Sequence, residues 1–299
     1  MSCMIGQVSY LPEVKEIRKA RKAAAWEQIE WFREILPSSP ITCVAQNYHE
    51  GDCVKGVSYI RLKNPVGPGA ARNYILKDFY ESDYDWLLLC DDDTTAYDRY
   101  SYKGFIKDLV NHPMKFEGVD AVSAVEPEYH PYKKLNFADK NTTTHYKFEP
   151  RELNSGSATS FIRNIRKYHG KELYFENINA ETGEGREDME FLFAWLKSGL
   201  TWYTMQTWIR KSLCFDKSSI FGYNVEERDK ILQVCLDNIC KKYADDGLMR
   251  TVGGKITWKN FNDRYNKSMK VLYIPRAVPI EYKPEDIPAT KKSNNYSLF

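Results

Sequence analysis

The stretch Trp86-Leu87-Leu88-Leu89-Cys90-Asp91-Asp92-Asp93 decides the fold. Its apolar run is typical of a buried strand in a parallel sheet, and three acids follow directly. Ligands of α/β sheets bind at the carboxyl ends of strands, so these acids stand where a ligand is expected. Alternation along the strand places Asp91 and Asp93 on one side and Asp92 on the other. Adjacent carboxylates repel one another unless a cation is near, which favours a divalent-ion site over a solvated acidic turn.

The segments around this stretch alternate between strands and helices. We expect strands at 6–10, 41–45, 57–62, 85–90, 121–125 and 200–207 from runs of β-branched and apolar residues. We expect helices at 14–36, 67–80, 102–111, 188–198 and 228–243 from apolar spacing and end signals. Residues 126–180 are expected to be irregular. Such alternation predicts an α/β fold with a mostly parallel sheet.

Composition excludes several classes of protein. The chain has 299 residues, 42% hydrophobic residues and a formal net charge of +2, which is ordinary for a globular protein. Seven scattered cysteines without a C-x-x-C pair argue against a disulfide framework and a zinc ribbon. No apolar run reaches the roughly 18 residues of a membrane span, and the start does not resemble a secretory signal. We therefore expect a cytoplasmic protein, in the host cytoplasm if it is encoded by a phage.

Two further motifs carry chemistry. Gly67-Pro68-Gly69-Ala70-Ala71-Arg72-Asn73 opens a helix whose N-terminus favours anions, although a plain Pro/Gly helix start explains it too. Glu187-Asp188 opens a later helix that ends at Gly199. Carboxylates there suit the helix dipole, and one of them is also placed to act as a general base on an acceptor hydroxyl.

Together the three motifs resemble the GT-A glycosyltransferases, in particular the large family 2 type. In that family a glycine-containing turn and Ala-Arg-Asn precede an apolar strand with Asp-x-Asp, and Glu-Asp later opens a helix. The matching positions are Ala71-Arg72-Asn73, Asp91-Asp92-Asp93 and Glu187-Asp188. The resemblance covers roughly residues 5–210. It implies a GT-A fold, a Rossmann-like nucleotide-sugar-binding sheet with acceptor-side elements, and a metal-dependent, inverting transfer from a nucleotide sugar.

The resemblance implies catalytic and metal roles for four acids. Asp93 would coordinate the Mn²⁺ or Mg²⁺ bound to the donor diphosphate, and Asp91 would contact that metal or the donor ribose. Asp188 would be the catalytic base, with Glu187 beside it orienting or accepting a hydrogen bond.

The resemblance also implies a set of donor-binding residues. Tyr10 would stack on the nucleotide base, and Arg72 would lie near it. The family has an Asp at the end of its second strand, where this chain has Ala45-Gln46-Asn47, so Gln46 or Asn47 would take that place with uridine as the expected base. We also expect Asp92 to contact the nucleotide-sugar donor.

The acceptor side rests on a basic stretch. Between Lys133 and Lys171, nine basic and three acidic residues give a local charge of +6, with aromatic residues interleaved. Such a surface suits nucleic acid, so we expect hydroxymethylated DNA bases as acceptor, as in phage enzymes, with Arg163, Arg166 and Lys167 in contact. A solvated charged face is the alternative interpretation of the stretch.

Other functions remain open. The alternative acceptor is a surface glycan, lipopolysaccharide or capsule precursor. The alternative activities are a nucleotidyltransferase of similar sheet architecture and a non-catalytic sugar-binding module. We expect a glycosyltransferase core over residues 1–210, with a donor half at 1–100 and an acceptor half at 101–210. A helical extension and tail would span 211–299.

Overall fold

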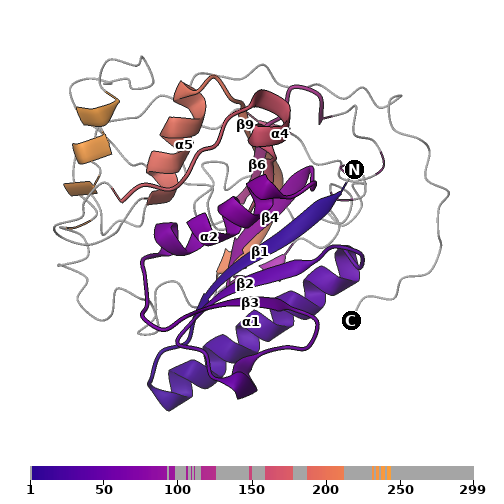
Figure 1. Ribbon diagram of the computed structural model, residues 1–299, viewed down its shortest axis with the longest axis vertical. Coiled ribbons are helices and arrows are strands. Elements are labelled where there is room, and N and C mark those ends of the chain that lie inside the picture. Colours follow the sequence, from indigo (N-terminus) through magenta and orange to yellow (C-terminus); the bar gives the residue numbers. More distant parts are fainter. Residues whose placement is uncertain are drawn as a thin grey trace.

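The computed structural model describes residues 2–92, 94–97, 116–125, 148–149, 159–177 and 187–211, together with isolated helical positions between 106 and 111 and between 231 and 243. This part of the chain forms one mixed sheet with helices on both faces (Figure 1). The elements are, in chain order, β1 (Cys3–Tyr10), α1 (Lys15–Ile35), β2 (Ile41–Gln46), a 3-10 helix (Glu50–Asp52), β3 (Ser58–Leu62), α2 (Pro68–Glu81), β4 (Trp86–Asp91), β5 (Thr94–Tyr97), β6 (Ala121–Val125), β7 (Phe148–Glu149), β8 (Thr159–Arg163), α4 (Ile165–His169), α5 (Glu187–Lys197) and β9 (Trp202–Lys211). The expected α/β class is confirmed.

The amino-terminal half of the sheet is parallel. Its strands lie in the order β3-β2-β1-β4, and all three pairings between them are parallel. In the register Tyr10 stands opposite Gln46, and Val8 stands opposite Asp91. The carboxyl ends of β1, β2 and β4 therefore lie side by side, which is where ligands of α/β sheets bind.

The other half of the sheet corrects two expectations. β8 lies between β4 and β6 and pairs antiparallel with both, and β9 pairs parallel with β6 but antiparallel with β5 and β7. The sheet is thus less parallel than expected, and the region 126–180 is not wholly irregular, because β8 and α4 fall within it. Phe161 and Ile162 of β8 alternate between the two cores of the molecule. A strand of five residues is too short for alternation to reveal it in a polar sequence.

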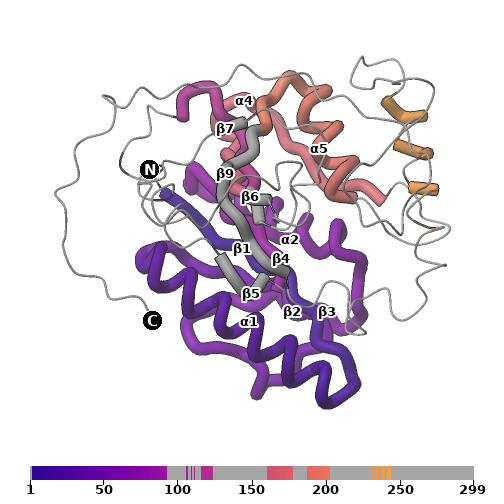
Figure 2. Tube along the Cα trace, turned by 180° about the vertical axis from the view of Figure 1, so that it is seen from behind, coloured from indigo at the N-terminus to yellow at the C-terminus, as the bar shows by residue number. Residues whose placement is uncertain are grey.

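Helix α1 covers one face of the sheet, which Figure 2 shows from behind. Ile29 and Phe32 are buried at helical spacing and pack in one cluster with Ile5 of β1 and Leu88 of β4. This face follows directly from the apolar stripe of the helix and the inward-facing residues of the strands.

Helices α2 and α5 cover the opposite face. Ile75 of α2 and Phe191 and Trp195 of α5 share a buried cluster with Leu87 of β4. The close approach of α2 to β1 requires a glycine at position 6, since a Cβ there would lie 2.3 Å from Cγ2 of Ile75. This packing sets where α2 and α5 begin relative to the ends of the strands.

The remaining elements agree with the sequence within a few residues. The helix expected at 188–198 spans Glu187–Lys197, and the strand expected at 200–207 spans Trp202–Lys211. The helices expected at 102–111 and 228–243, and most of the extension 211–299, fall largely outside the described residues. None of the helices in the described part combines the length and apolarity needed to cross a membrane.

Candidate active site

The first two acids of the triplet turn to opposite faces of the sheet, as strand alternation predicts. Asp91, the last residue of β4, turns to the α2 face, where its Oδ1 accepts a hydrogen bond from Nη2 of Arg72 at 2.8 Å. Its side chain is 18% exposed, so the carboxylate is reachable from solvent. The third acid, Asp93, lies outside the described residues.

Asp92 turns to the α1 face and is 2% exposed. Its Oδ1 pairs with Nη2 of Arg21 at 2.5 Å, and its Oδ2 accepts hydrogen bonds from Oγ of Ser9 at 2.5 Å and the backbone N–H of Tyr10 at 3.2 Å. The donor-binding role expected for Asp92 stays a prediction, and the contacts that the structure shows for it are internal. Both carboxylate oxygens are engaged inside the protein, where they brace the end of β4 against α1 and β1.

Arg72 joins the end of β4 to the start of α5. Its Nη1 donates to Oε1 of Glu187 at 2.7 Å, while its Nη2 donates to Asp91. The guanidinium is 4% exposed, and the ring of Phe175 lies 5.2 Å from its central carbon. Burial acts to lower the pKa of Arg72, but Asp91 and Glu187 outweigh it and raise the pKa above its usual value. Arg72 is therefore a fixed positive charge between two carboxylates.

Glu187 and Asp188 occupy the first turn of α5 but differ in surroundings. Glu187 is buried beside Arg72; burial raises its pKa, Arg72 opposes this, and Asp188 raises it further. Asp188 is only partly buried, and its Oδ1 accepts a hydrogen bond from the backbone N–H of Met189 at 2.8 Å. The Glu-Asp pair thus divides into an inward carboxylate bound to Arg72 and an outer carboxylate at the helix start.

The start of α2 packs closely against the first turn of α5. A Cβ on Gly69 would lie 3.1 Å from Cγ of Glu187 and 3.1 Å from Cβ of Phe175, so no side chain fits there without a shift. Asn73 holds the backbone of Phe175 through two hydrogen bonds of 2.8 Å. The ring of Phe175 stacks on Phe191 of α5 with centroids 4.1 Å apart. Residues 69 to 73 therefore pack against the start of α5, which carries the Glu-Asp pair, directly at Glu187 and through Phe175.

The expected base-binding residues stand at the ends of β1 and β2. Tyr10 is half-buried, and Gln46 is fully buried. Oε1 of Gln46 accepts a hydrogen bond from the backbone N–H of Val66 at 2.6 Å, while its Nε2 has no partner among the described residues. Asn47 instead closes a turn: its φ is 58°, and its Nδ2 donates to the carbonyl of Leu11 at 2.7 Å. Of the two residues, Gln46 has a buried donor without a partner among the described residues, whereas the Asn47 amide is bonded to Leu11.

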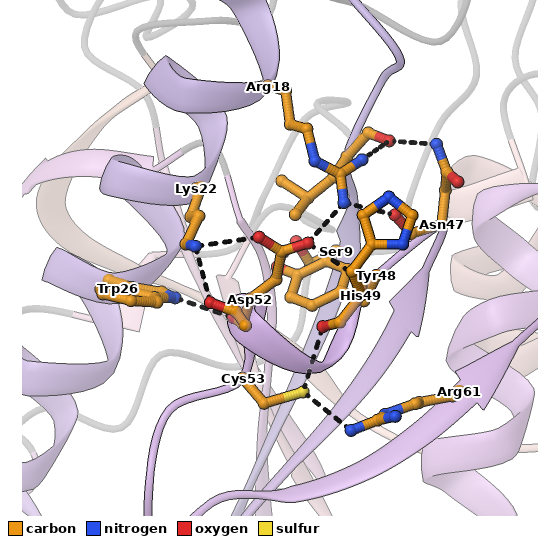
Figure 3. Close-up of polar contacts among 12 residues, drawn as sticks. Ser9, Arg18, Lys22, Trp26, Asn47, Tyr48, His49, Asp52, Cys53 and Arg61 are labelled. Atoms are coloured by element: carbon orange, nitrogen blue, oxygen red, sulfur yellow. Dashed lines mark hydrogen bonds and ion pairs between the residues drawn. The ribbon is translucent and has the colours of Figure 1, made fainter. Parts of the chain in front are cut away.

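The loop after β2 is anchored to α1 by Asp52 (Figure 3). Asp52 pairs with Arg18 and with Nζ of Lys22 at 2.9 Å, and it accepts a hydrogen bond from the backbone N–H of His49 at 3.0 Å. Nε1 of Trp26 donates to the Asp52 carbonyl at 3.1 Å. Burial acts to raise the pKa of Asp52, but Lys22, the backbone N–H of His49 and Arg18 together lower it to about 2. This cluster fixes the loop beside Tyr10 and Gln46 and is itself internally satisfied.

The expected acceptor-binding residues lie at the other end of the sheet. Arg163 pairs in register with Trp86, the first residue of β4, so it stands about 16 Å from Asp91 at ~3.3 Å per residue. Its guanidinium lies 4.0 Å from the ring centroid of Tyr168. The other two cations are ion-paired, Arg166 with Glu172 at 3.1 Å and Lys167 with Asp85 at 2.8 Å. The structure does not bring these three residues to the carboxylate site, and most of the basic stretch 133–171 lies outside the described residues.

Sequence reasoning missed the inward polar residues of α1. Arg21 and Gln28 are both buried. Gln28 donates from Nε2 to the carbonyl of Asp91 at 2.8 Å, and Nε2 of Gln7 donates to its Oε1 at 2.5 Å. The available signal was spacing, because positions 21 and 28 share the helix face of the buried Ala24 and Ala25. A charged or amide side chain on an inner face needs a buried partner.

A second polar contact links α5 to the carboxyl-terminal part of the chain. Glu190 is fully buried, and its Oε1 accepts hydrogen bonds from Nζ of Lys242 at 2.7 Å and the hydroxyl of Tyr243 at 2.6 Å. Lys242 also pairs with Glu176 at 2.6 Å. Positions 242 and 243 therefore pack against the helix that begins with the Glu-Asp pair.

Comparisons with known proteins give matches in structure only. No family model and no curated protein sequence matches this chain. Glucosyl-3-phosphoglycerate synthase from Mycobacterium tuberculosis, in complex with Mn²⁺, UDP-glucose and phosphoglyceric acid, is 9% identical, with 84% of each chain covered and a TM-score of 0.48. TarS 1–349 from S. aureus, in complex with UDP-GlcNAc, is 14% identical, with 80% of this chain and 67% of that chain covered and a TM-score of 0.42. A nucleotide-diphospho-sugar transferase from Desulfovibrio desulfuricans is 11% identical, covering 68% of this chain and 80% of that chain at a TM-score of 0.39. These three structures have in common a nucleotide sugar, either as the bound ligand or in the name of the enzyme, and each has a TM-score below 0.5.

Proposed function

We propose that this protein is a glycosyltransferase that transfers a sugar from a nucleotide-sugar donor to a hydroxyl group with inversion, assisted by a divalent cation. One observation carries the proposal. The ends of three adjacent parallel strands place Tyr10, Gln46 and Asp91 together, and Arg72 ties Asp91 to the turn that holds Asp188. The two residues expected to bind the nucleotide base, a strand-end carboxylate and a candidate general base therefore lie at one edge of the sheet.

The base-binding end is supported by an unsatisfied donor. Nε2 of Gln46 is buried without a partner among the described residues. A buried donor that lacks a partner costs roughly 1–3 kcal/mol, and a carbonyl oxygen of a pyrimidine base such as uracil would satisfy it. The half-buried ring of Tyr10 on the neighbouring strand offers a face for the same base.

The cation would be held by Asp91 and Asp93. Carboxylate oxygens at the end of a strand are the donor type that Mg²⁺ and Mn²⁺ prefer, and the partly exposed Asp91 fits such an ion. No cluster of three or more potential ligands is present among the described residues, of which Asp93 is not one. When bound, the ion would neutralise charge on the donor diphosphate.

Asp188 would take the proton from the acceptor hydroxyl. Glu187 is buried and bound to Arg72, whereas Asp188 is only partly buried, so an acceptor hydroxyl can approach the outer acid of the pair. An aspartate within hydrogen-bond reach of the attacking hydroxyl removes its proton as the oxygen forms a bond to the sugar carbon. The nucleoside diphosphate leaves from the opposite side of the sugar carbon, which inverts the configuration at that carbon.

The acceptor is proposed only as a hydroxyl compound, with hydroxymethylated DNA and surface glycans as the two classes to compare. The described cations expected to contact DNA stand at the amino end of β4 and are engaged within the protein. Binding to duplex DNA through phosphate contacts weakens as the salt concentration rises. Duplex binding that is still measurable at about 150 mM salt would therefore favour DNA as the acceptor.

A donor screen tests the proposed activity. The purified chain is incubated with UDP-, GDP-, CDP- and TDP-sugars, with Mn²⁺ or with EDTA, and release of nucleoside diphosphate is measured. We expect cleavage of a UDP-sugar that needs the cation. A second incubation supplies a nucleoside triphosphate and a sugar phosphate, and release of pyrophosphate there would instead show the nucleotidyltransferase. Binding of sugar without turnover would show the sugar-binding module.

Asp188→Asn is the matched test of the base. This change keeps the shape of the side chain and removes its ability to accept a proton, so transfer should fall by 10²-fold or more, on the order of a general-base contribution. Donor affinity, measured by calorimetry, should stay within about three-fold of the unmodified protein. Asp78→Asn, an exposed carboxylate on α2, is the control and should change neither quantity. Normal transfer by Asp188→Asn would move the base elsewhere.

A further inference from the structure

Arg72 is the side chain that bonds to both halves of the candidate site. Its two terminal nitrogens bind different carboxylates, Asp91 at the end of β4 and Glu187 at the start of α5, at 2.8 and 2.7 Å. These acids are 96 positions apart in the chain, taken from their numbers. The planar guanidinium offers donors in a fixed fork, so two simultaneous bonds set both distance and angle between their acceptors.

The surroundings of Arg72 leave it little freedom. The side chain is 4% exposed, and the Phe175 ring lies over the guanidinium. Phe175 is in turn held by Asn73, the next residue of α2, and stacks on Phe191 of α5. A side chain locked by packing and by neighbouring hydrogen bonds can hold a reactive group within the tolerance that catalysis requires.

The contact with the two acids also bears on the position near the nucleotide base that is expected for Arg72. Two of the five N–H donors of the guanidinium bind carboxylates inside the protein, and Nε is buried without a partner among the described residues. A residue that read the nucleotide base directly would need a donor aimed at the base. The position near the base that the sequence resemblance implies for Arg72 stays a prediction, and the contact with the two acids is what the structure shows.

We propose that Arg72 is a positioning residue that fixes the first turn of α5, and with it Asp188, against the carboxyl end of β4. The inference rests on the proposed function for the role of Asp188, but the docking of α5 through Arg72 stands on the structure of the chain alone. Gly69 contributes to the same positioning, because a Cβ there would lie 3.1 Å from Cγ of Glu187 and would press the first turn of α5 away from α2.

The test compares Arg72→Lys and Arg72→Met by three measurements. Amide hydrogen exchange is followed at residues 191–194, whose helical hydrogen bonds reach the carbonyls of 187–190 and open when the first turn detaches. Nucleotide affinity is followed by calorimetry, and transfer is followed at saturating donor. We expect Arg72→Met to speed exchange at 191–194 at least ten-fold and to lower kcat about 10²-fold, the loss expected from a displacement of about 1 Å.

Two features separate positioning from donor binding and from plain stability. Donor Kd should stay within about three-fold, because Arg72 does not read the donor. Arg72→Lys should recover part of kcat, since one ammonium group replaces a two-pronged fork. Arg72→Met and Glu187→Gln should not add in their effects on kcat, because both break the same link. Arg33→Met, which breaks the exposed pair with Glu30 on α1, is the control and should change none of these quantities.

Several outcomes overturn the proposal. Unchanged exchange at 191–194 would show that Arg72 does not dock α5, and a donor Kd weakened more than ten-fold with kcat intact would return Arg72 to base recognition. If Arg72→Met does not fold, Glu187→Gln carries the same exchange measurement from the other end of the link. If the unmodified protein proves inactive, the proposed function fails, while the exchange measurement still decides whether Arg72 holds the turn.

Discussion

Asp92→Asn separates a bracing role from a donor-binding role within the acidic triplet. The change keeps the size of the side chain and removes its charge. The side chains of Asp92 and Arg21 are 2% and 8% exposed, so the variant removes the carboxylate that pairs with a buried guanidinium. Breaking a buried pair in this way costs about 3–5 kcal/mol. The hydrogen bonds from Ser9 and Tyr10 can still be accepted by the amide oxygen, so they add little to the loss.

Urea denaturation and calorimetry together provide the assay. We expect the free energy of unfolding to fall by about 3–5 kcal/mol, and the thermal midpoint to fall by about 10 °C for a chain of this size. The double variant Arg21→Met/Asp92→Asn should recover more than half of the loss, because removing both charges leaves no uncompensated ion. In the folded variant, nucleotide affinity should stay within about three-fold of the unmodified protein.

Asp91→Asn is the matched comparison and should behave in the opposite way. Arg72 keeps Glu187 as a partner when Asp91 loses its charge, so the stability loss should be smaller. The partly exposed Asp91 carboxylate faces the proposed donor site, so transfer should fall further than in Asp92→Asn. If Asp92→Asn unfolds within about 1 kcal/mol of the unmodified protein while donor affinity drops more than ten-fold, the bracing role is refuted.

Three further changes test the packing and electrostatics that position the site. Gly69→Ala should lower transfer at least ten-fold while changing stability by only about 1 kcal/mol, because better helix propensity offsets overpacking against the start of α5. Gly51→Ala, which has open space around it, is the control and should change neither transfer nor stability. Equal losses of transfer in the two variants would contradict the prediction. The pKa of Asp52 is about 2 when folded against 3.8 ordinarily, so Asp52→Asn should cost about 2 kcal/mol at pH 7. That difference should disappear as the pH falls from about 4 through 2 in urea titrations; a constant difference would show that the ion pairs contribute nothing. Gly6→Ala should destabilise by about 1–3 kcal/mol or more in denaturation, and Ile75→Leu should relieve it while Ile75→Val, which keeps the clashing Cγ2, should not; equal rescue by both would rule out this clash.

The sequence by itself determined the α/β class and the acidic end of β4. Trp86 to Cys90 is a continuous apolar run followed by acids, and a buried strand of this kind needs no partner information to be recognised. The opposite orientations of Asp91 and Asp92 also followed from the sequence, since alternation is a property of any strand. The start of α5 was predicted to within one residue, because Glu-Asp before an apolar helical pattern is a local signal.

The tertiary structure alone decided which residue meets which. Nothing local to Arg72 tells that it bonds to Glu187, because the two come together only when α2 and α5 pack on the same face of the sheet. The same holds for Arg21 and Asp92, where an inner helix position meets the end of a strand. Strand β8 was missed because its pairing with β4 supplies most of what stabilises a five-residue strand. Periodicity and local signals thus fix the elements and the face that each residue occupies, while partners are set by packing between segments distant in the chain.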